Sequence, residues 1–495
     1  MHVDPSRHST GFLILLSLPT AAIGFSLSAA VASTTWLLST RYGLHLDNIA
    51  LIWLAGPLMG LFVQPLVGAL SDRTWLLGGR RRLYLLIGGT AGAISMYALL
   101  HLDQLAAVTT LSLLSVAVVV TLLLDLSTNV TFNPARSLVA DLTAEGPQRV
   151  RGYAWMQTVS GLFGVSAYLV SIFLGNAVLI QVTVAVTFLC TVVPTLLIRE
   201  PAPEQVSPSP GAAAAASRAG GHPFRALLPM AGLGAYGLYV AVDKVLLKGA
   251  LSGFAVPLFL LAAASTVAWG VSLVWRDRVR GSAALRLRKI LLAHGLAWLG
   301  VQGMFVMAFF FVRDFIVPGS PSQEVMANVF HRWINGSTPS AADTAGNILS
   351  MGFLLMNIVG ALLPVTLLDP LCRRWGKVAV HRAAMGLMAL GFLFIALAAR
   401  SEGSYYLGML LVGVGWSSLI SIVFAIFSES VDPREMGVSM GVFNSSLVLP
   451  ALAVPGLLQI SEHLDQHRWI FGLFAACLSL SWAFWLSVAE RPQTP

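Results

Sequence analysis

The sequence predicts an all-helical integral membrane protein that crosses the bilayer fourteen times. Of its 495 residues, 56% are hydrophobic and only 11% are charged, whereas soluble globular chains carry about 25% charged residues. Apolar runs of about 20 residues, the length of a helix that spans a bilayer, recur along the whole chain. Membrane β-barrels instead show short segments of alternating hydrophobicity, so we expect helices throughout.

The first half contains six such runs, followed by a stretch rich in Pro, Ser, Ala and Gly. That composition cannot build a core and predicts a flexible cytoplasmic linker. The expected elements are helices over 11–38, 48–70, 83–101, 106–133, 153–175 and 178–198, which make an N-terminal bundle of residues 1–198, and the linker 199–225.

The second half contains eight runs, of which the first two are an inserted pair. If that pair does not cross the membrane, the protein has twelve spans. The expected elements are helices over 226–242, 250–275, 290–316, 346–368, 378–399, 404–428, 437–460 and 468–488. They group into an inserted pair with a basic loop (226–289), a C-terminal six-helix bundle (290–489) and a cytoplasmic tail (490–495).

The charges set the orientation in the membrane. The net charge is +8, and with a cytoplasmic N-terminus the Lys and Arg clusters all fall in cytoplasmic loops, as the positive-inside rule requires. We therefore expect both termini in the cytoplasm of a cell membrane, lipid as a partner and no nucleic acid. The three cysteines, Cys190, Cys372 and Cys477, have neither disulfide nor metal spacing, and no cofactor is expected.

Two six-helix halves joined by a linker are the plan of a large secondary carrier. The sequence contains no nucleotide-binding P-loop and no nucleophile constellation, so we expect neither an enzyme nor an ATP-driven pump. A weak internal repeat supports the plan, because "QPLVGALSDRTWLLGGRRR" in the first half is echoed by "LPVTLLDPLCRRWGK" in the second.

The segment between the second and third helices carries the most specific motif, and it resembles the signature of the major facilitator superfamily. A carboxylate at a helix C-terminus is unfavourable, so the Asp of the motif needs a nearby cation or another helix's N-terminus, and Arg offers several donors for such contacts. We expect a cytoplasmic gate made of Gly68, Asp72, Arg73, Gly79, Arg80, Arg81 and Arg82, with Asp369, Arg373, Arg374 and Gly376 as counterparts in the echo.

Four longer stretches carry a more particular resemblance: "IWLAGPLMGLFVQPLVGALSDRTWLLGGRRR", "DLSTNVTFNPARSLVADLT", "GVGWSSLISIVFAIFSES" and "GVSMGVFNSSLVLP". They resemble the plant sucrose–proton symporters and their animal proton-coupled sugar-carrier relatives. The resemblance implies a major facilitator fold and symport of a sucrose-, maltose- or glucose-like sugar or glycoside with a proton, or with sodium, by alternating access. A proton-coupled efflux carrier for lipophilic compounds and a non-transporting membrane sensor or assembly factor are the alternatives.

A polar stripe follows the fourth apolar run. Asp125, Asn129, Phe132 and Arg136 are spaced by four, three and four residues, which places them on one helical face. Asp125 follows about 15–19 residues of expected helix, and an Asp at the membrane centre costs ~2.5–3.5 kcal/mol. About 16 Å of helix separates Asp125 from Arg136, so they do not form a salt bridge with each other.

The family resemblance implies roles for these residues. It implies a substrate-binding Arg136 and a proton-coupling Asp125, and Asn129 belongs to the same cavity-lining stripe. Asp141 lies 160° around the helix from Asp125 and is expected in the cytoplasmic gate. In the second half, "FFFVRDF" matches a family motif only at Asp314, a second candidate for proton coupling, and Gln157 and Asn444 are candidates for cavity contact.

Overall fold

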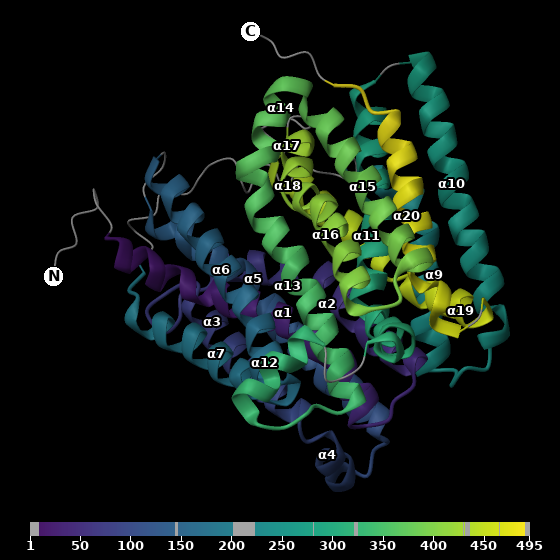
Figure 1. Ribbon diagram of the computed structural model, residues 1–495. Helices are drawn as coiled ribbons and strands as arrows, with labels where there is room; N and C mark the ends of the chain where they lie inside the picture. The colour runs from purple at the N-terminus through teal and green to yellow at the C-terminus, as the bar shows by residue number, and fades with distance from the viewer. Residues whose placement is uncertain are drawn as a thin grey trace. The chain divides into compact units, whose positions relative to one another are not determined.

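The computed structural model describes residues 9–143, 147–200, 223–280, 282–320, 325–428, 430, 436–464 and 466–490. Across these ranges the chain is built from helices and turns (Figure 1), and a single β-bridge between Leu76 and Gly79 is the only extended pairing. The all-helical fold is therefore confirmed for the described residues. Thirteen helices within them are long and apolar enough to cross a membrane. The run expected at 48–70 lies in α2, whose side chains are only partly described, so the count of fourteen stays a prediction.

The chain divides into two compact units. The first contains residues 1–208 and 326–350, and the second contains residues 209–325 and 351–495. In the first unit α1 packs along α6 and α7, while α2 and α3 pack on α5. Its helices are α1 (Thr10–Thr40), α2 (Leu46–Arg73), α3 (Arg82–Leu99), α4 (Leu102–Thr109), α5 (Leu113–Leu142), α6 (Pro147–Leu174), α7 (Asn176–Leu197) and α12 (Met326–Asn335).

In the second unit α11 packs against α18 and α20, and α15 packs against α16 and α20. Large aromatic side chains, Phe471 and Trp485 among them, fill its core. Its helices are η2 (Pro223–Met230), α9 (Ala231–Val245), η3 (Ser252–Phe254), α10 (Ala255–Arg280), α11 (Ala283–Phe311), η4 (Val312–Ile316), η5 (Val317–Gly319), η6 (Pro364–Leu368), α14 (Asp369–Trp375), α15 (Lys377–Ala398), α16 (Glu402–Leu419), α17 (Ile422–Ser428), α18 (Met436–Ala451), α19 (Val454–His463), η8 (Gln466–Trp469) and α20 (Ile470–Leu486). Helix α13 (Ala341–Leu363) runs from the first unit into the second.

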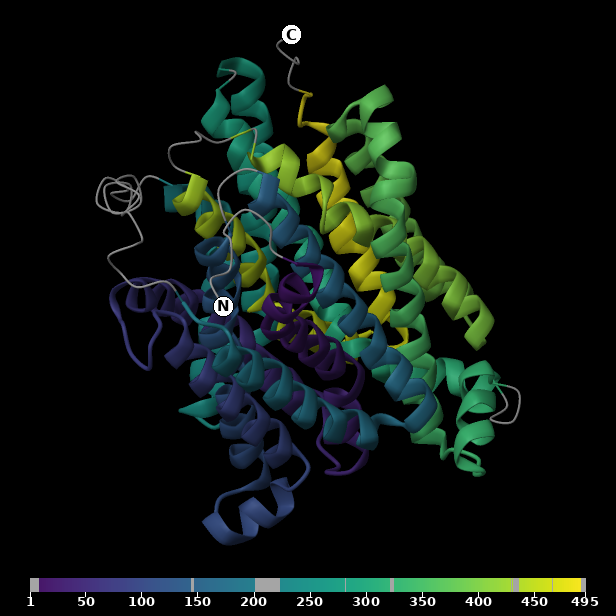
Figure 2. The same cartoon turned by 90° about the vertical axis from the view of Figure 1, so that its left-hand side faces the viewer.

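The fourth apolar run begins later than the sequence predicts. Instead of one helix from residue 106, the short helix α4 ends at Thr109 and Thr110 adopts a left-handed φ of 57°. Helix α5 then starts at Leu113, capped by Ser112, whose Oγ accepts the Ser115 N–H at 3.1 Å. After the break α4 lies at one end of the first unit, at the bottom of Figure 2. Asp125 is about 18 Å along the helix axis from the start of α5.

The inserted pair packs within the second unit. Gly237 of α9 lies so close to Leu452 that a Cβ there would overlap its backbone, and Gly456 of α19 likewise has no room beside the ring of Phe259 on α10. Small residues of this kind let membrane helices approach closely. Figure 1 shows α10 as a long helix at the edge of this unit, beside α20.

The segment between the helices expected at 290–316 and 346–368 contains a helix that the apolar runs did not predict. Helix α12 carries exposed Met326, Val329, Trp333 and Ile334. The helix packs on α6, where Phe330 meets Phe173 edge-on at 5.5 Å. Ten residues are too few to span a bilayer, which is why a search for spanning runs missed α12.

Candidate functional site

Asp125 lies in the middle of α5, and its carboxylate faces α2. Gly56 of α2 lies beside it: a Cβ built there would come within 3.1 Å of the Asp125 Oδ2. Among the residues that the structure describes, no side chain donates a hydrogen bond to this carboxylate or forms an ion pair with it. A charge inside a membrane helix is costly unless it is paired or faces a cavity, and the proton-coupling role expected of Asp125 stays a prediction.

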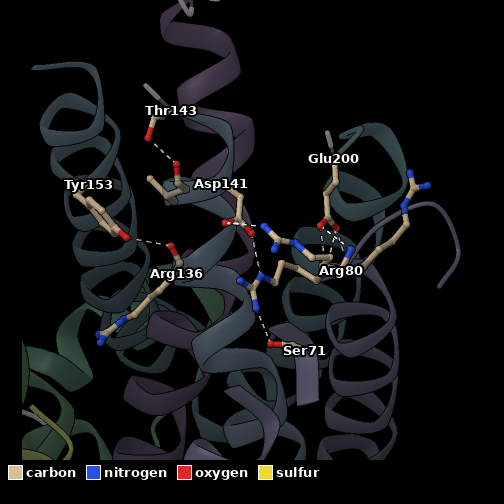
Figure 3. A network of polar contacts seen from close by, with 10 residues as sticks. Ser71, Arg80, Arg136, Asp141, Thr143, Tyr153 and Glu200 are labelled. Carbon is tan, nitrogen blue, oxygen red and sulfur yellow. Dashed lines mark hydrogen bonds and ion pairs between the residues drawn. The ribbon is translucent and has the colours of Figure 1, made fainter. Parts of the chain in front are cut away.

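Arg136 lies three turns further along α5, on the face predicted from the spacing. Its guanidinium covers the Phe132 ring at 4.0 Å from the ring centre, which confirms that these two side chains are neighbours. The side chain is exposed and, among described residues, meets no carboxylate. Its backbone carbonyl accepts the Tyr153 hydroxyl at 3.3 Å (Figure 3). The guanidinium donors are therefore available to a ligand that carries oxygen atoms.

The other expected substrate contacts differ in burial. Asn129 is buried, and its Nδ2 donates to the Asp125 backbone carbonyl at 2.8 Å. Gln157 on α6 and Asn444 on α18 are exposed. Asn129 and Gln157 belong to the first unit and Asn444 to the second, and a shared site for all of them stays a prediction.

The arginine triplet after α2 forms a polar network in the first unit (Figure 3). Buried Arg81 donates through Nε to the Asp141 Oδ2 at 2.9 Å and through Nη1 to the Ser71 Oγ at 2.6 Å. Arg80 is 3.4 Å from the other oxygen of Asp141. These contacts connect α5 with the end of α2 and the start of α3. They pair Asp141 with two arginines of the triplet, and its part in a cytoplasmic gate stays a prediction.

Glu200, which the sequence analysis did not single out, caps the N-terminus of α3. Its carboxylate accepts the backbone N–H groups of Arg80, Arg81 and Arg82 at 2.8, 3.0 and 2.9 Å. A Cβ on Gly79 would overlap this carboxylate, so the glycine of the motif makes room for the cap. A negative charge at a helix N-terminus is favourable because the N–H groups there lack partners within the helix.

Arg82 makes a second set of contacts between α3 and α7. Its side chain donates to the carbonyls of Thr195, Leu196 and Ile198 at 3.0, 2.7 and 3.2 Å. These carbonyls end α7, where a cation is favoured. Glu200 and Arg82 therefore tie the third and sixth long helices of the first unit together from both sides.

In the second unit Glu490 caps a helix N-terminus in the same way. The Glu490 carboxylate accepts the N–H groups of Lys377 and Val378 at 3.0 and 2.9 Å, at the start of α15. Gly376, with φ of 89°, leaves the room that a Cβ would fill. Each Glu follows the end of a long helix by a few residues, in "IRE" and "VAE", and this shared position is the signal that could have revealed both.

The remaining expected gate residues are only partly described. The backbones of Gly68, Asp72, Arg73 and Asp369 are helical, but the side chains of the three charged residues lie outside the described part of the structure. Arg373 and Arg374 are exposed in the last turn of α14. A gating role for the whole set stays a prediction.

Asp314 lies in a π-helical turn, Val312–Ile316, that follows α11. Unlike Asp125, it is paired: the Arg313 Nε is 2.6 Å from Oδ1, and the His467 Nδ1 is 2.7 Å from Oδ2. An ion pair stabilises the charged form of a carboxylate. The expectation that Asp314 itself exchanges the coupling proton therefore meets a physical objection, and His467 is a partner that the sequence analysis missed.

A second polar cluster joins the start of α13 to the first unit. The Ser171 Oγ of α6 is 2.6 Å from the Ser350 Oγ of α13 and donates to the Asn176 Oδ1 at 2.6 Å. Asn328 of α12 donates to Thr344 at 2.8 Å. All of these side chains are buried, and their hydrogen bonds hold residues that follow α11 in the chain against α6 and α7.

Comparison with known proteins identifies the family of this fold. The model of the Major Facilitator Superfamily matches residues 16–455. The sucrose transport protein SUC4 of Arabidopsis thaliana is 34% identical over 161 residues, which are 30% of this chain and 31% of that protein. The general alpha-glucoside permease of Schizosaccharomyces pombe is 30% identical over 178 residues, 33% of this chain and 31% of the permease. The matches span about a third of the length of these relatives.

Solved structures agree with the fold. The nucleoside transporter NupG aligns with a TM-score of 0.61 at 12% identity, over 97% of this chain and 100% of that one. The POT family transporter PepTSo aligns with a TM-score of 0.62 at 14% identity, over 97% and 98% of the two chains. At such identities the likeness concerns the fold alone.

Proposed function

The chain belongs to the major facilitator superfamily, and we propose that within this family of membrane transporters it moves a sugar or glycoside together with a proton. The proposed location is the cell membrane, with both termini in the cytoplasm. The observation that carries the proposal is the state of Asp125, an acid within a membrane-spanning helix whose carboxylate has no cationic partner among the described residues. Such a group can take up and release a proton without first breaking an ion pair.

Arg136 supports the sugar part of the proposal. Its guanidinium lies over the Phe132 ring, is exposed and meets no carboxylate in the described chain. Its five N–H donors suit the hydroxyl oxygens of a sugar. The sucrose transport protein and the alpha-glucoside permease, to which parts of the chain are similar, suggest a sucrose- or maltose-like substrate.

The proposed cycle couples the two groups along one helix. Asp125 and Arg136 are separated by about 16 Å of α5, so the proton and the sugar bind at different depths of one face. Protonation of Asp125 removes a negative charge from a membrane-spanning helix. This lowers the cost of moving α5 between the two states that alternating access requires. Release of the proton on the other side restores the charge and completes the cycle.

Transport by the purified full chain in proteoliposomes tests this function. We expect labelled sucrose, maltose or glucose to accumulate when the outside is made acidic, and a protonophore to abolish the accumulation. Asp125→Asn should lose this accumulation but keep sugar counterflow, because exchange needs no net proton movement. Arg136→Ala should lose both. If the wild-type protein moves none of these sugars, or if Asp125→Asn accumulates sugar normally, the proposed function is wrong.

A further inference from the structure

The end of α11 and the start of α20 meet at a three-residue cluster in the second unit. Arg313 and Asp314 lie in the π-helical turn after α11, and His467 lies in η8 directly before α20. Residues one apart on a helix do not normally face each other, yet the Arg313 guanidinium contacts the Asp314 carboxylate through Nε and Nη2 at 2.6 and 3.1 Å. It does so beside Phe310, whose ring centre is 5.0 Å from the guanidinium carbon.

His467 reaches the same carboxylate from 153 positions further along the chain. Its Nδ1 is 2.7 Å from the Asp314 Oδ2, and its ring lies 5.2 Å from that of Phe310. The side chains of Asp314 and His467 are 29% and 18% exposed, so both are reachable by solvent but not freely hydrated. This contact joins the end of α11 to the start of α20 through polar groups.

Within this cluster, only the histidine is suited to respond to pH. Arg stays charged, and a carboxylate held by a guanidinium favours its ionised form. Histidine changes charge between about pH 5 and 8 when unperturbed. Among the residues that the structure describes, the other charged or titratable groups of η8 and the end of α19 are exposed: Arg468 in the same turn, and Glu462 and His463 on α19. Helix α20 carries no charged residue between Ile470 and Leu486.

We propose that His467 is a proton-sensitive positioning residue for Asp314. When protonated, it holds the carboxylate by an ion pair and keeps the end of α11 joined to the start of α20. When neutral, it makes a weaker contact, and the two ends can separate. The proton-dependent group at this end of the second unit is then the imidazole rather than the carboxylate. The consequence for transport rests on the proposed function, while the contact itself does not.

Chemical modification tests the contact without any substrate. Diethyl pyrocarbonate reacts with neutral imidazole, and mass spectrometry resolves the modified histidines of the full-length protein. We expect Asp314→Asn to raise the modification rate of His467 about threefold near pH 6.5, as loss of a partly exposed charge pair would do. His463, whose Nδ1 contacts the Gln459 carbonyl instead, should react equally in both proteins and reports that this surface is folded. Equal rates at His467 in both proteins would overturn the proposal.

Transport variants test the consequence. His467→Asn keeps an N–H donor but cannot change charge, so we expect it to flatten the dependence of sugar uptake on external pH between about 5.5 and 8. His463→Asn is the matched control and should keep the wild-type profile. A wild-type profile in His467→Asn would overturn the proposed role in transport. If the wild-type protein moves no sugar, the proposed function fails, and the modification rates alone decide whether His467 holds Asp314.

Discussion

The carboxylate of Asp125 lies directly against Gly56. All three atoms of the carboxyl group are within 3.3 Å of the position that a Cβ of residue 56 would occupy. Gly56 belongs to the "IWLAGP" stretch of α2, so a glycine of the family-like motif sits where it leaves room for the acid of the next polar stretch. Two motifs that are far apart in the chain therefore meet at one contact.

Gly56→Ala should disturb this contact without unfolding the protein. A flexible carboxylate can shift by a few tenths of an ångström, but a displaced acid exchanges its proton less well. We expect proton-driven uptake to fall about tenfold, within the range seen when a reacting group is misplaced. Gly161→Ala is the matched control, because a Cβ there meets no atom within 4 Å. Equal uptake by both variants would contradict the positioning of Asp125 by Gly56.

Removal of the Glu200 cap should destabilise the first unit. Glu200→Ala leaves three N–H groups at the start of α3 without their acceptor. Loss of a helix N-cap costs about 1–2 kcal/mol, which should lower the thermal unfolding temperature in detergent by a few degrees. Glu490→Ala should have a smaller effect, because Glu490 is exposed and caps two N–H groups. Gln104→Ala, at an exposed position of α4 in the same unit, is the control, and an equal unfolding temperature for it and Glu200→Ala would argue against the cap.

A disulfide should form between residues 171 and 350. The two Ser Oγ atoms are 2.6 Å apart, so Ser171→Cys with Ser350→Cys, in a background without the native cysteines, should crosslink under mild oxidation. A protease site in the predicted linker then reveals the bridge, because the two fragments stay together on a non-reducing gel. Uptake should stop while the bridge is present and return on reduction.

Ser166→Cys is the control for this crosslink. It lies on the same helix α6, but its Oγ donates to the Phe163 carbonyl, and five residues turn it well away from the face of Ser171. Crosslinking of residue 350 with residue 166 as efficiently as with residue 171 would show that the described contact between α6 and α13 is not specific.

The fourteen-span prediction places residue 246, directly after α9, on the outer side of the membrane. Leu246 is 70% exposed, so Leu246→Cys should react with a membrane-impermeant maleimide in intact cells. Cys372, in a basic segment predicted to be cytoplasmic, should react only after permeabilisation. Labelling of Leu246→Cys only in permeabilised cells would mean that the chain has fewer spans.

The long helices could be predicted from the sequence alone. An unbroken apolar run must satisfy its own backbone in lipid, so composition determined that these segments are helical, and the spacing along one helix determined that Phe132 and Arg136 are neighbours. The boundaries were less predictable. Helix α5 starts at Leu113 because Thr110 is left-handed and Ser112 provides a cap, a local effect that hydrophobicity does not report.

Only the tertiary structure decided which polar groups are partners. Glu200 and Arg80 are 120 residues apart in the chain, and Asp314 and His467 are 153 apart. The sequence around one residue of each pair does not indicate which distant residue it contacts. Asp125 and Asp314 were both candidates for proton coupling in the sequence. In the structure Asp125 lies against a glycine, whereas Asp314 is paired with Arg313 and His467. The reason is physical: hydrophobicity acts on each segment separately, whereas the charge state of a carboxylate depends on the atoms within a few ångströms of it, and folding brings those from distant helices.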